Sequence, residues 1–466
     1  MKKDGIRFNV TYLFGITMVS ALGGLLFGYD LVVIGGAKEF YELVYGLSDP
    51  AIKGWAVSSC IVGCIIGAMS VGKPADVFGR KKLLSLSALL FFVSAIGSGY
   101  APTFNQFVLY RLLGGIGMGI ASTLSPMYIA EVSPASMRGR FVSLNQMTIV
   151  IGILLAQLVN YLIMCSHPVP EGVSGVALMG TWLGKTGWRW MFAAESIPAL
   201  AFFMLMFFVP RSPRWLCRVE KSDEAKAVME KIGGEQYASE SLISINETLE
   251  NTHHLNEFAE MLKPKMLKIM FLGIGIAVFS QWCGINVIFN YAHDIFKAAG
   301  YGVNAVLFNL VVVGLTNFLF TFVAVAVVDR LGRKKLFLFG AVSLGISFSL
   351  VGLCFHMQSQ GIHVLILVLL SIACFASSIG PISWVLISEI FPNRIRGVAT
   401  SIAVLSMWIA NFVLAYTFPS MNAYLGADKT FWIYSGICFI GAVFIIKCVP
   451  ETKGKTLEQI EKELVD

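Results

Sequence analysis

The segment "DVFGRKK" at residues 76–82 recurs as "DRLGRKK" at residues 329–335. Two further pairs of segments recur in the same order, "EVSPASMRG" (131–139) with "EIFPNRIRG" (389–397) and "PRSPRW" (210–215) with "PETKGK" (450–455). The members of each pair lie 240 to 258 residues apart. Repetition at a nearly constant offset is the signature of internal duplication. We therefore predict two similar halves joined in parallel.

Between these segments the chain is strongly apolar. Of its 466 residues, 56% are hydrophobic and only 14% are charged, and the mean hydropathy is +0.74. Soluble domains do not have this composition, and about 20 apolar residues in a helix cross a bilayer. Twelve segments qualify: 10–36, 53–72, 83–101, 105–128, 141–164, 188–209, 266–292, 305–328, 336–356, 363–388, 398–419 and 428–448. We predict an all-α integral membrane protein with twelve transmembrane helices, six in each half.

The basic residues predict the orientation of these helices. Apart from Arg111, which lies in a span, one side of the membrane receives only Lys38, Lys53, Lys185, Arg189, Lys297 and Lys429. Because basic loops stay in the cytoplasm, both termini are expected there, in a multi-pass protein of the plasma (bacterial inner) membrane. The first span is too long for a signal peptide and lacks a cleavage pattern, so we expect it to remain.

The duplication and the hydropathy divide the chain into four parts. Residues 1–210 and 266–449 are the expected six-helix halves, and residues 450–466 form a cytoplasmic tail. Residues 211–265 form a polar linker with helices expected near 221–233 and 238–262, where Lys and Glu alternate at helical spacing. The linker is too short and polar to bury a sizeable core.

Three ionisable residues lie inside the predicted spans. Asp30 interrupts "GGLLFGYDLVVIGG" (23–36), and Arg111 and Glu195 lie in the fourth and sixth spans. Such a group costs about 2.5 kcal/mol or more to insert and is usually paired or faces a cavity. Arg111 cannot lose its charge, so Asp30 is its expected partner. The pair either fixes helix packing only, or binds and releases a proton as the helices move.

Taken together and in their places, the repeated motifs resemble those of the sugar porter family of the major facilitator superfamily. The segments "RLLGGIGMGIASTLSPMYIAE", "GWRWMFAAESIPA", "GINVIFNYA" and "CVPETKGKTLE" are similar to those of the bacterial proton-coupled xylose symporters. The resemblance covers nearly the whole chain. It implies alternating access to a monosaccharide site between two halves, with a proton as the coupling ion and no other cofactor.

The resemblance gives the intramembrane charges a role. Proton-linked sugar porters have Asp at the position of Asp30, where animal glucose facilitators have Asn. Arg111 and Glu195 also match motif residues of the symporters. The resemblance thus implies that Asp30, Arg111 and Glu195 couple proton movement to sugar transport, with a purely structural role open for Glu195.

Uncharged polar residues in the spans are candidates for sugar binding. Amides both donate and accept hydrogen bonds, and aromatic rings cover the C–H face of a sugar. The candidates are Gln157, Gln281, Asn286, Asn290, Asn317, Gly380, Trp384 and Trp408. Gly284 is expected to break the seventh span, and Gly380 with Pro381 to loosen the tenth. A single buried amide can instead be an interhelical hydrogen bond, and a single Trp a lipid anchor.

The chain departs from the xylose symporters around this set. Ser280 replaces the first Gln of a pair, Asn290 replaces a sugar-facing Tyr, and Met407 replaces a Gln beside Trp408. Ile153 also replaces a symporter Gln, whereas Gln157 matches the glucose facilitators. D-xylose is therefore the first expectation, and glucose, galactose and arabinose are alternatives.

The repeated motifs place opposite charges at the cytoplasmic ends of the spans. The resemblance implies a salt-bridge gate made of Arg80, Glu131, Arg138, Arg333, Glu389 and Arg396. A role in topology and solubility alone is the alternative. Arg211 stands where the family has an acidic residue, so we predict a weakened or rewired gate in the N-terminal half.

These features favour a proton-coupled monosaccharide symporter. The alternatives are a proton-independent uniporter and a sugar-sensing receptor, although the segment after Lys453 is short for signalling. An enzyme is not expected, because no nucleophile–base pair or metal motif is evident and His293, His253 and His254 are isolated or in the polar linker. The expected partners are the sugar, the proton and membrane lipid, without nucleic acid, and we expect a monomer.

Overall fold

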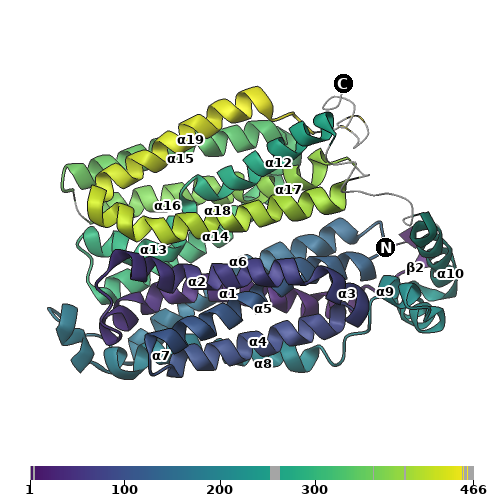
Figure 1. Cartoon of the computed structure of the whole chain (residues 1–466), viewed down its shortest axis with the longest axis horizontal. Coiled ribbons are helices and arrows are strands. Elements are labelled where there is room, and N and C mark those ends of the chain that lie inside the picture. Colours follow the sequence, from purple (N-terminus) through teal and green to yellow (C-terminus); the bar gives the residue numbers. More distant parts are fainter. Residues whose placement is uncertain are drawn as a thin grey trace. The chain divides into compact units, whose positions relative to one another are not determined.

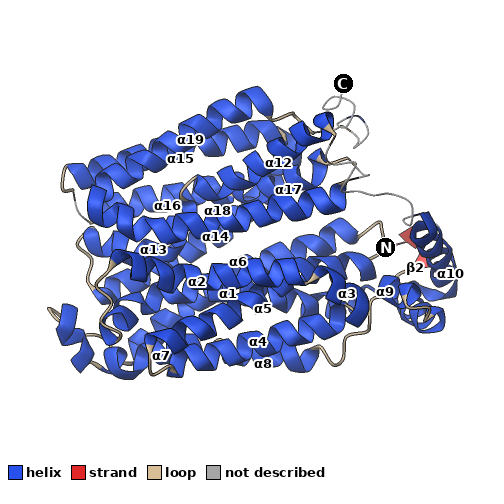
Figure 2. Cartoon of the chain, in the orientation of Figure 1, coloured by secondary structure: helices blue, strands red, loops and turns tan. Residues whose placement is uncertain are grey.

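A computed structural model describes residues 2–3, 6–251, 263–359, 361–392 and 395–453, with Lys455 and Gln459. Figure 2 shows that helices account for almost all of this part of the chain. Eleven helical segments in it are long and apolar enough to cross a membrane. The chain is therefore a multi-pass membrane protein. We call the predicted cytoplasmic side inner and the opposite side outer.

The elements follow the predicted spans closely (Figure 1). Before the linker they are α1 (Val10–Val44), α2 (Pro50–Ser70), α3 (Gly72–Phe78), α4 (Arg80–Tyr100), α5 (Phe104–Val132), α6 (Arg138–Ser166), η1 (Gly175–Gly180), η2 (Leu183–Gly187), α7 (Trp188–Ala193) and α8 (Ser196–Leu205). After it they are α12 (Pro264–Trp282), α13 (Ile285–Ala298), α14 (Val303–Leu331), α15 (Arg333–His356), α16 (Ile362–Ala376), α17 (Ile379–Ile390), α18 (Arg396–Leu425) and α19 (Ala427–Cys448).

The linker is helical where it is described. It contains α9 (Pro213–Arg218) and α10 (Ser222–Asn251), and α10 is kinked at Gly234, whose φ of 83° is left-handed. This kink falls between the two predicted linker helices, and residues 252–262 of the second one lie outside the described residues. A two-residue antiparallel pair, β1 (Lys2–Lys3) with β2 (Ile6–Arg7), is the exception to the all-helical expectation.

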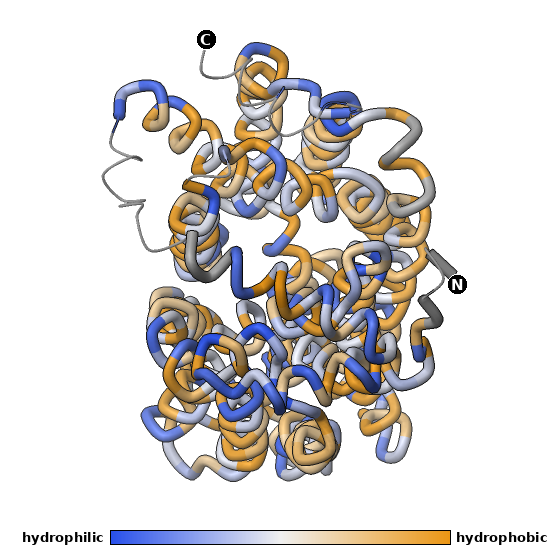
Figure 3. Tube along the Cα trace, turned by 90° about the vertical axis from the view of Figure 1, so that its right-hand side faces the viewer, coloured by the Kyte–Doolittle hydropathy of each residue, from blue (hydrophilic) through white to orange (hydrophobic). Residues whose placement is uncertain are grey.

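The sixth predicted span differs from a continuous helix. It consists of α7 and α8, which are separated at Ala194–Glu195. The described part thus has eleven long apolar helical segments, of which α12 with α13 and α16 with α17 each count as one, and a twelfth crossing built from two short helices. Figure 3 shows that hydrophobic residues line the helices, while hydrophilic residues gather at helix ends and turns.

The chain forms two compact units. Unit 1 comprises residues 1–31, 62–153 and 192–255, and unit 2 comprises residues 32–61, 154–191 and 256–466. These boundaries cut through α1, α2 and α6, so the outer ends of these helices pack in one unit with the C-terminal helices. The halves at 1–210 and 266–449 remain a prediction from the sequence repeat.

Two spans are broken where the sequence predicts it. Gly284 adopts a left-handed conformation with φ 88° between α12 and α13, a conformation that is costly for residues with a Cβ. The second break, at Ser377–Ser378, separates α16 from α17 just before Gly380 and Pro381. Breaks of this kind free backbone groups near a transport site.

Glycine allows α1 and α6 to approach closely in unit 1. A Cβ added to Gly28 would lie 1.9 Å from the carbonyl oxygen of Ile149, and one added to Gly152 would lie 2.0 Å from that of Leu25. Contacts this short involve backbone atoms that cannot rotate away. Small residues at these positions therefore set the separation between the two helices.

We predict that Gly28→Ala lowers the free energy of unfolding by about 1–3 kcal/mol, because the added methyl group forces α1 and α6 apart. Gly15→Ala is the matched control, since a Cβ at Gly15 of the same helix meets no atom within 4 Å. Thermal unfolding in detergent, followed by tryptophan fluorescence, measures both. Equal stability of the two variants would contradict the packing argument.

Candidate functional site

Unit 1 holds a buried ion pair between α1 and α5. A guanidinium nitrogen of Arg111 donates to a carboxylate oxygen of Asp30, and a second donates to the Asp30 carbonyl at 3.3 Å. Both side chains are about 2% exposed. Gly114, one turn after Arg111, allows α4 to approach here, because a Cβ there would lie 2.4 Å from Oγ of Ser94. The predicted partnership of Asp30 and Arg111 is present.

Glu195 completes the set of intramembrane charges in unit 1. It lies at the break between α7 and α8, is 2% exposed, and is within electrostatic range of Asp30 and Arg111. Its Oε1 has no hydrogen-bond partner in the described part of the chain. The ring of Phe192 lies 5.8 Å from the Arg111 guanidinium. The three predicted proton-coupling residues therefore form one buried group.

The eight predicted sugar-binding residues all belong to unit 2. Two of them interact directly, because the Asn286 amide donates to Oε1 of Gln281 across the break at Gly284. The Gln281 amide in turn donates to Ser280 Oγ at 3.1 Å. The hydroxyl that replaces a Gln of the xylose symporters therefore orients the neighbouring amide.

Two further amides have unused hydrogen-bonding capacity. Gln157 and Asn290 are each 2% exposed, and Oε1 of Gln157 and Nδ2 of Asn290 lack a hydrogen-bond partner among the described residues. An unsatisfied buried polar atom costs about 1–3 kcal/mol. Oε1 of Gln157 lies against Gly314 of α14, where a Cβ would be only 1.9 Å away. A hydroxyl-rich ligand would satisfy both amides.

The remaining predicted ligands have different exposures. Asn317, one turn after Gly314 on α14, is 5% exposed, and Trp408 on α18 is 4% exposed. Trp384 on α17 is 43% exposed, and Gly380 is half-buried in the first turn of that helix.

The predicted gate residues Arg80, Glu131 and Arg138 lie around one cavity in unit 1. Arg80 Nη2 lies 2.9 Å from Oε1 of Glu131, and Ser212 Oγ donates to the other carboxylate oxygen. Arg138 donates to the carbonyl of Ala130 at 3.1 Å. A cavity of about 1280 Å³ is lined in part by Arg80, Glu131 and Arg138. These charges thus border open space as well as each other.

The C-terminal half repeats this arrangement in unit 2. Arg333 pairs with Glu389 at 3.4 Å, and Thr452 Oγ1 donates to the other Glu389 oxygen at 2.6 Å. Arg396 donates to the carbonyl of Phe391 at 3.0 and 3.2 Å. Each arginine–glutamate pair therefore lies within one copy of the repeated motifs. The second glutamate oxygen accepts a hydrogen bond from Ser212 in one copy and from Thr452 in the other.

The two copies of the motif differ at the residue before Ser212 and Thr452, which is Arg211 in one copy and Glu451 in the other. Glu451 accepts the backbone N–H groups of Arg333 at 3.0 Å and Lys334 at 3.2 Å, and so caps α15. Arg211 occupies the equivalent position in the other half and cannot accept a hydrogen bond. It lies 3.5 Å from Glu224 instead, with both side chains largely exposed. Whether the gate of the N-terminal half is weakened or rewired stays a prediction.

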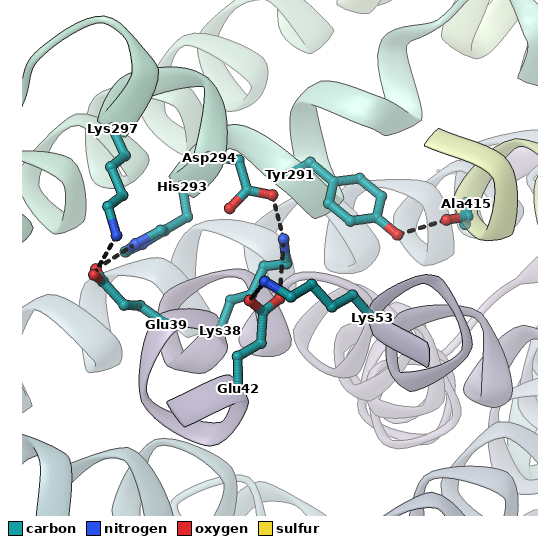
Figure 4. A network of polar contacts seen from close by, with 9 residues as sticks. All are labelled: Lys38, Glu39, Glu42, Lys53, Tyr291, His293, Asp294, Lys297 and Ala415. Carbon is teal, nitrogen blue, oxygen red and sulfur yellow. Dashed lines mark hydrogen bonds and ion pairs between the residues drawn. The ribbon is translucent and has the colours of Figure 1, made fainter. Parts of the chain in front are cut away.

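The sequence prediction missed a cluster of charges in unit 2 (Figure 4). The first span was expected to end at 36, but α1 continues to Val44 and carries Lys38, Glu39 and Glu42. His293, expected to be isolated, is 1% exposed and lies 2.9 Å from Glu39. Both expectations were wrong because ion pairs with residues about 250 positions away stabilise charges inside a helix.

Comparisons with known proteins agree with this geometry. The model of the family described as "Sugar (and other) transporter" matches residues 16–464. The chain is 41% identical to a D-xylose-proton symporter of Escherichia coli (strain K12), over 98% of this chain and 96% of the relative. It is 38% identical to an arabinose-proton symporter of Bacillus subtilis (strain 168), over 96% and 94%.

Solved structures give the same result. The inward-open conformation of the xylose transporter XylE from E. coli matches with a TM-score of 0.84 at 38% identity, over 97% of this chain and 100% of that chain. A structure of the proton:xylose symporter XylE bound to 6-bromo-6-deoxy-D-glucose matches with a TM-score of 0.79 at 39% identity, over 98% and 100%. The chain has the major facilitator fold and belongs to the sugar transporter family.

Proposed function

We propose that the protein is a proton-coupled monosaccharide symporter that works by alternating access. The observation that carries this proposal is the buried pair of Asp30 and Arg111. A facilitator of neutral sugars has no need of an intramembrane carboxylate, whose insertion is costly. Symport activity in relatives that match almost the whole chain supports the same function.

The coupling step follows from the chemistry of the pair. While Arg111 donates to Asp30, the carboxylate is stabilised in its ionised form. A proton binds Asp30 only when movement of α1 or α5 separates the two groups. Glu195, buried beside them, is the next acceptor for that proton. Conformation thus controls protonation, and the proton gradient drives the sugar.

We propose D-xylose as the first substrate, with glucose, galactose and arabinose as alternatives. The amides of Gln157, Gln281 and Asn290 provide donors and acceptors for hydroxyl groups, and a xylose symporter is among the similar relatives. Pentoses and hexoses differ by one hydroxymethyl group, which changes binding by about 1–3 kcal/mol. A change from Tyr to Asn at Asn290 is large enough to alter this choice.

We also propose a location, an orientation and an oligomeric state for the protein. Both termini lie in the cytoplasm of a cell with the protein in its plasma (bacterial inner) membrane, as the distribution of basic residues indicates. The protein acts as a monomer. A uniporter is the second candidate, favoured by Gln157, which matches the glucose facilitators.

Uptake of labelled sugars into energised vesicles tests the function. We expect one sugar of the panel to accumulate above its external concentration, and a protonophore to abolish the accumulation without blocking equilibration. Competition by unlabelled sugars ranks the substrates. Equilibration without accumulation for every sugar would favour the uniporter.

We predict that Asp30→Asn abolishes uphill uptake but keeps sugar counterflow, because the amide does not exchange a proton in the transport cycle. Asp49→Asn, at an exposed position outside the spans, is the matched control and should accumulate sugar like the wild type. Proton-driven uptake and counterflow in the same vesicles measure the two effects. Uphill uptake by Asp30→Asn would refute its coupling role.

We predict that Gly314→Ala raises KM about tenfold. The added methyl group would lie 1.9 Å from Oε1 of Gln157 and displaces this flexible amide. Loss of one ligand hydrogen bond of about 1.4 kcal/mol corresponds to a tenfold change. Gly436→Ala is the control, because its Cβ meets no atom within 4 Å. A KM unchanged by Gly314→Ala would exclude Gln157 from sugar binding.

We predict that Arg211→Glu stabilises unit 1 by about 0.5–2 kcal/mol, because the carboxylate can cap α4 as Glu451 caps α15. A stronger inner gate should also slow transport and change the populations of the two conformers. Arg211→Gln, which removes the charge but adds no carboxylate, is the control. Thermal unfolding and transport rates together measure the effect, and no change in either would reject it.

A further inference from the structure

The outer part of unit 2 contains a group of titratable side chains that the proposed transport cycle does not use. They come from α1, α2 and α13, and we call them the outer charge cluster: Lys38, Glu39, Glu42, Lys53, His293, Asp294 and Lys297. Figure 4 shows the residues of α13 facing those of α1. Buried charges of this kind are retained only where they are paired and usually have a function.

Glu39 is the centre of one arm of the cluster. Its Oε2 lies 2.9 Å from Nε2 of His293, and its Oε1 accepts from the Lys297 ammonium. Glu39 is 7% exposed, whereas the Lys297 side chain is 52% exposed. Nδ1 of His293 has no hydrogen-bond partner among the described residues, and Nε2 is the ring nitrogen that donates to the Glu39 carboxylate. The carboxylate thus receives two donors from α13.

Lys38 is the centre of the other arm. It pairs with Asp294 of α13 and lies 3.2 Å from Glu42. Its ammonium also lies 4.7 Å from the ring centre of Tyr291, a favourable cation–π position. Glu42 is shared with Lys53 of α2 at 2.8 Å. This arm joins three helices and does not involve Glu39.

α13 is built as a separate segment that these contacts hold in place. It begins after the left-handed Gly284 and contains a non-helical residue, Tyr291. Its backbone lies against Gly35 of α1, where a Cβ would be 3.5 Å from the Phe289 carbonyl oxygen. Asn290, a proposed sugar ligand, precedes His293 by one turn. Movement of α13 away from α1 would therefore break the contacts of Glu39. The same movement would displace Asn290.

We propose that Glu39, with His293 and Lys297, is a second proton-responsive site, distinct from Asp30. It holds α13 against α1 while Glu39 is ionised, and it releases α13 when Glu39 takes up a proton from the outer side. The physiological role of this site rests on the proposed transport function. The movement of α13 relative to α1 can nevertheless be measured without sugar.

The direction follows from linkage. The closed arrangement gives ionised Glu39 two donors, both of which are lost when α13 moves away, so proton uptake favours release. The other titratable groups near Glu39 are Lys38, Tyr41 and Glu42 on α1, Lys53 on α2, and Tyr291 and Asp294 on α13. Among the helices packed against α13, α16 carries His363 and α18 carries Tyr416 and Tyr424 toward their outer ends. Acid on the outside, where the proton gradient places it, therefore opens the outer side.

Electron spin resonance can measure the separation of α1 and α13. Spin labels are placed at Ser48 and Ala298, which are exposed, after replacement of the accessible cysteines Cys165, Cys354 and Cys448. Between pH 6 and pH 3 we expect the ratio of the long to the short distance to rise about tenfold, because a glutamate freed from its two donors takes up a proton as the pH falls through the ordinary Glu pKa of about 4.3. Glu39→Gln should give the long distance already at pH 6, with less than a twofold change down to pH 3.

Controls separate this site from other groups. Asp428→Asn removes a partner of His356, 3.1 Å away in an exposed pair between α15 and α19, and should leave the wild-type response. Asp30→Asn should also keep the response. Should Glu39→Gln fail to fold, Lys297→Gln removes the exposed partner and should move the midpoint to higher pH.

A wild-type pH response in Glu39→Gln, an unchanged midpoint in Lys297→Gln, or loss of the response in Asp30→Asn would overturn the proposal. Sugar uptake by the wild type is measured in parallel. A distance change with pH but no uptake of any sugar would reject the proposed function and leave the proton-responsive site standing. Proton-driven uptake without a pH-dependent distance would reject the proton-responsive site and leave the proposed function standing.

Discussion

A charge inside a membrane has to be paired, and this constraint explains much of the molecule. Hydrocarbon offers neither water nor counterions, so an ionised side chain is stable only beside a partner held by another helix. Asp30 with Arg111 satisfies this requirement in unit 1, and Lys38 with Asp294 satisfies it in unit 2. Each pair joins distant parts of the sequence. The same bonds that permit the charges thus position the helices, and any change in protonation also changes packing.

The sequence predicts the parts of the structure that depend on local patterns. Helix breaks at Gly284 and before Gly380 follow from residue conformational preferences, and the Arg80–Glu131 and Arg333–Glu389 pairs follow from the repeated motifs. The pairing of Asp30 with Arg111 follows because the predicted N-terminal spans contain few charges. Residue properties are sufficient for the helix breaks and for the Asp30–Arg111 pair, whereas the salt bridges among the gate residues are implied by the family resemblance.

What the sequence did not predict depends on contacts between remote residues. Lys38, Glu39 and Glu42 have the composition of a loop, and only their partners on α13 explain why α1 continues through them. His293 has no motif around it, since its partner lies 254 positions away. The break in the sixth span at Glu195 was missed because short apolar helices have the same hydropathy as one long helix. Charged residues close to a predicted span end can therefore belong to the helix when the outer end of another span carries the complementary charge.

The cap that Glu451 provides to α15 makes the first turn of this helix more stable than the first turn of α4. Two backbone amides at the start of α15 are held by a carboxylate, while Arg211 cannot do the same for α4. Amide hydrogens in the first turn of α4 should therefore exchange with solvent sooner than those of α15. The two copies of the repeated motif therefore differ in local stability: the start of α15 is fastened by a carboxylate, and the start of α4 is not.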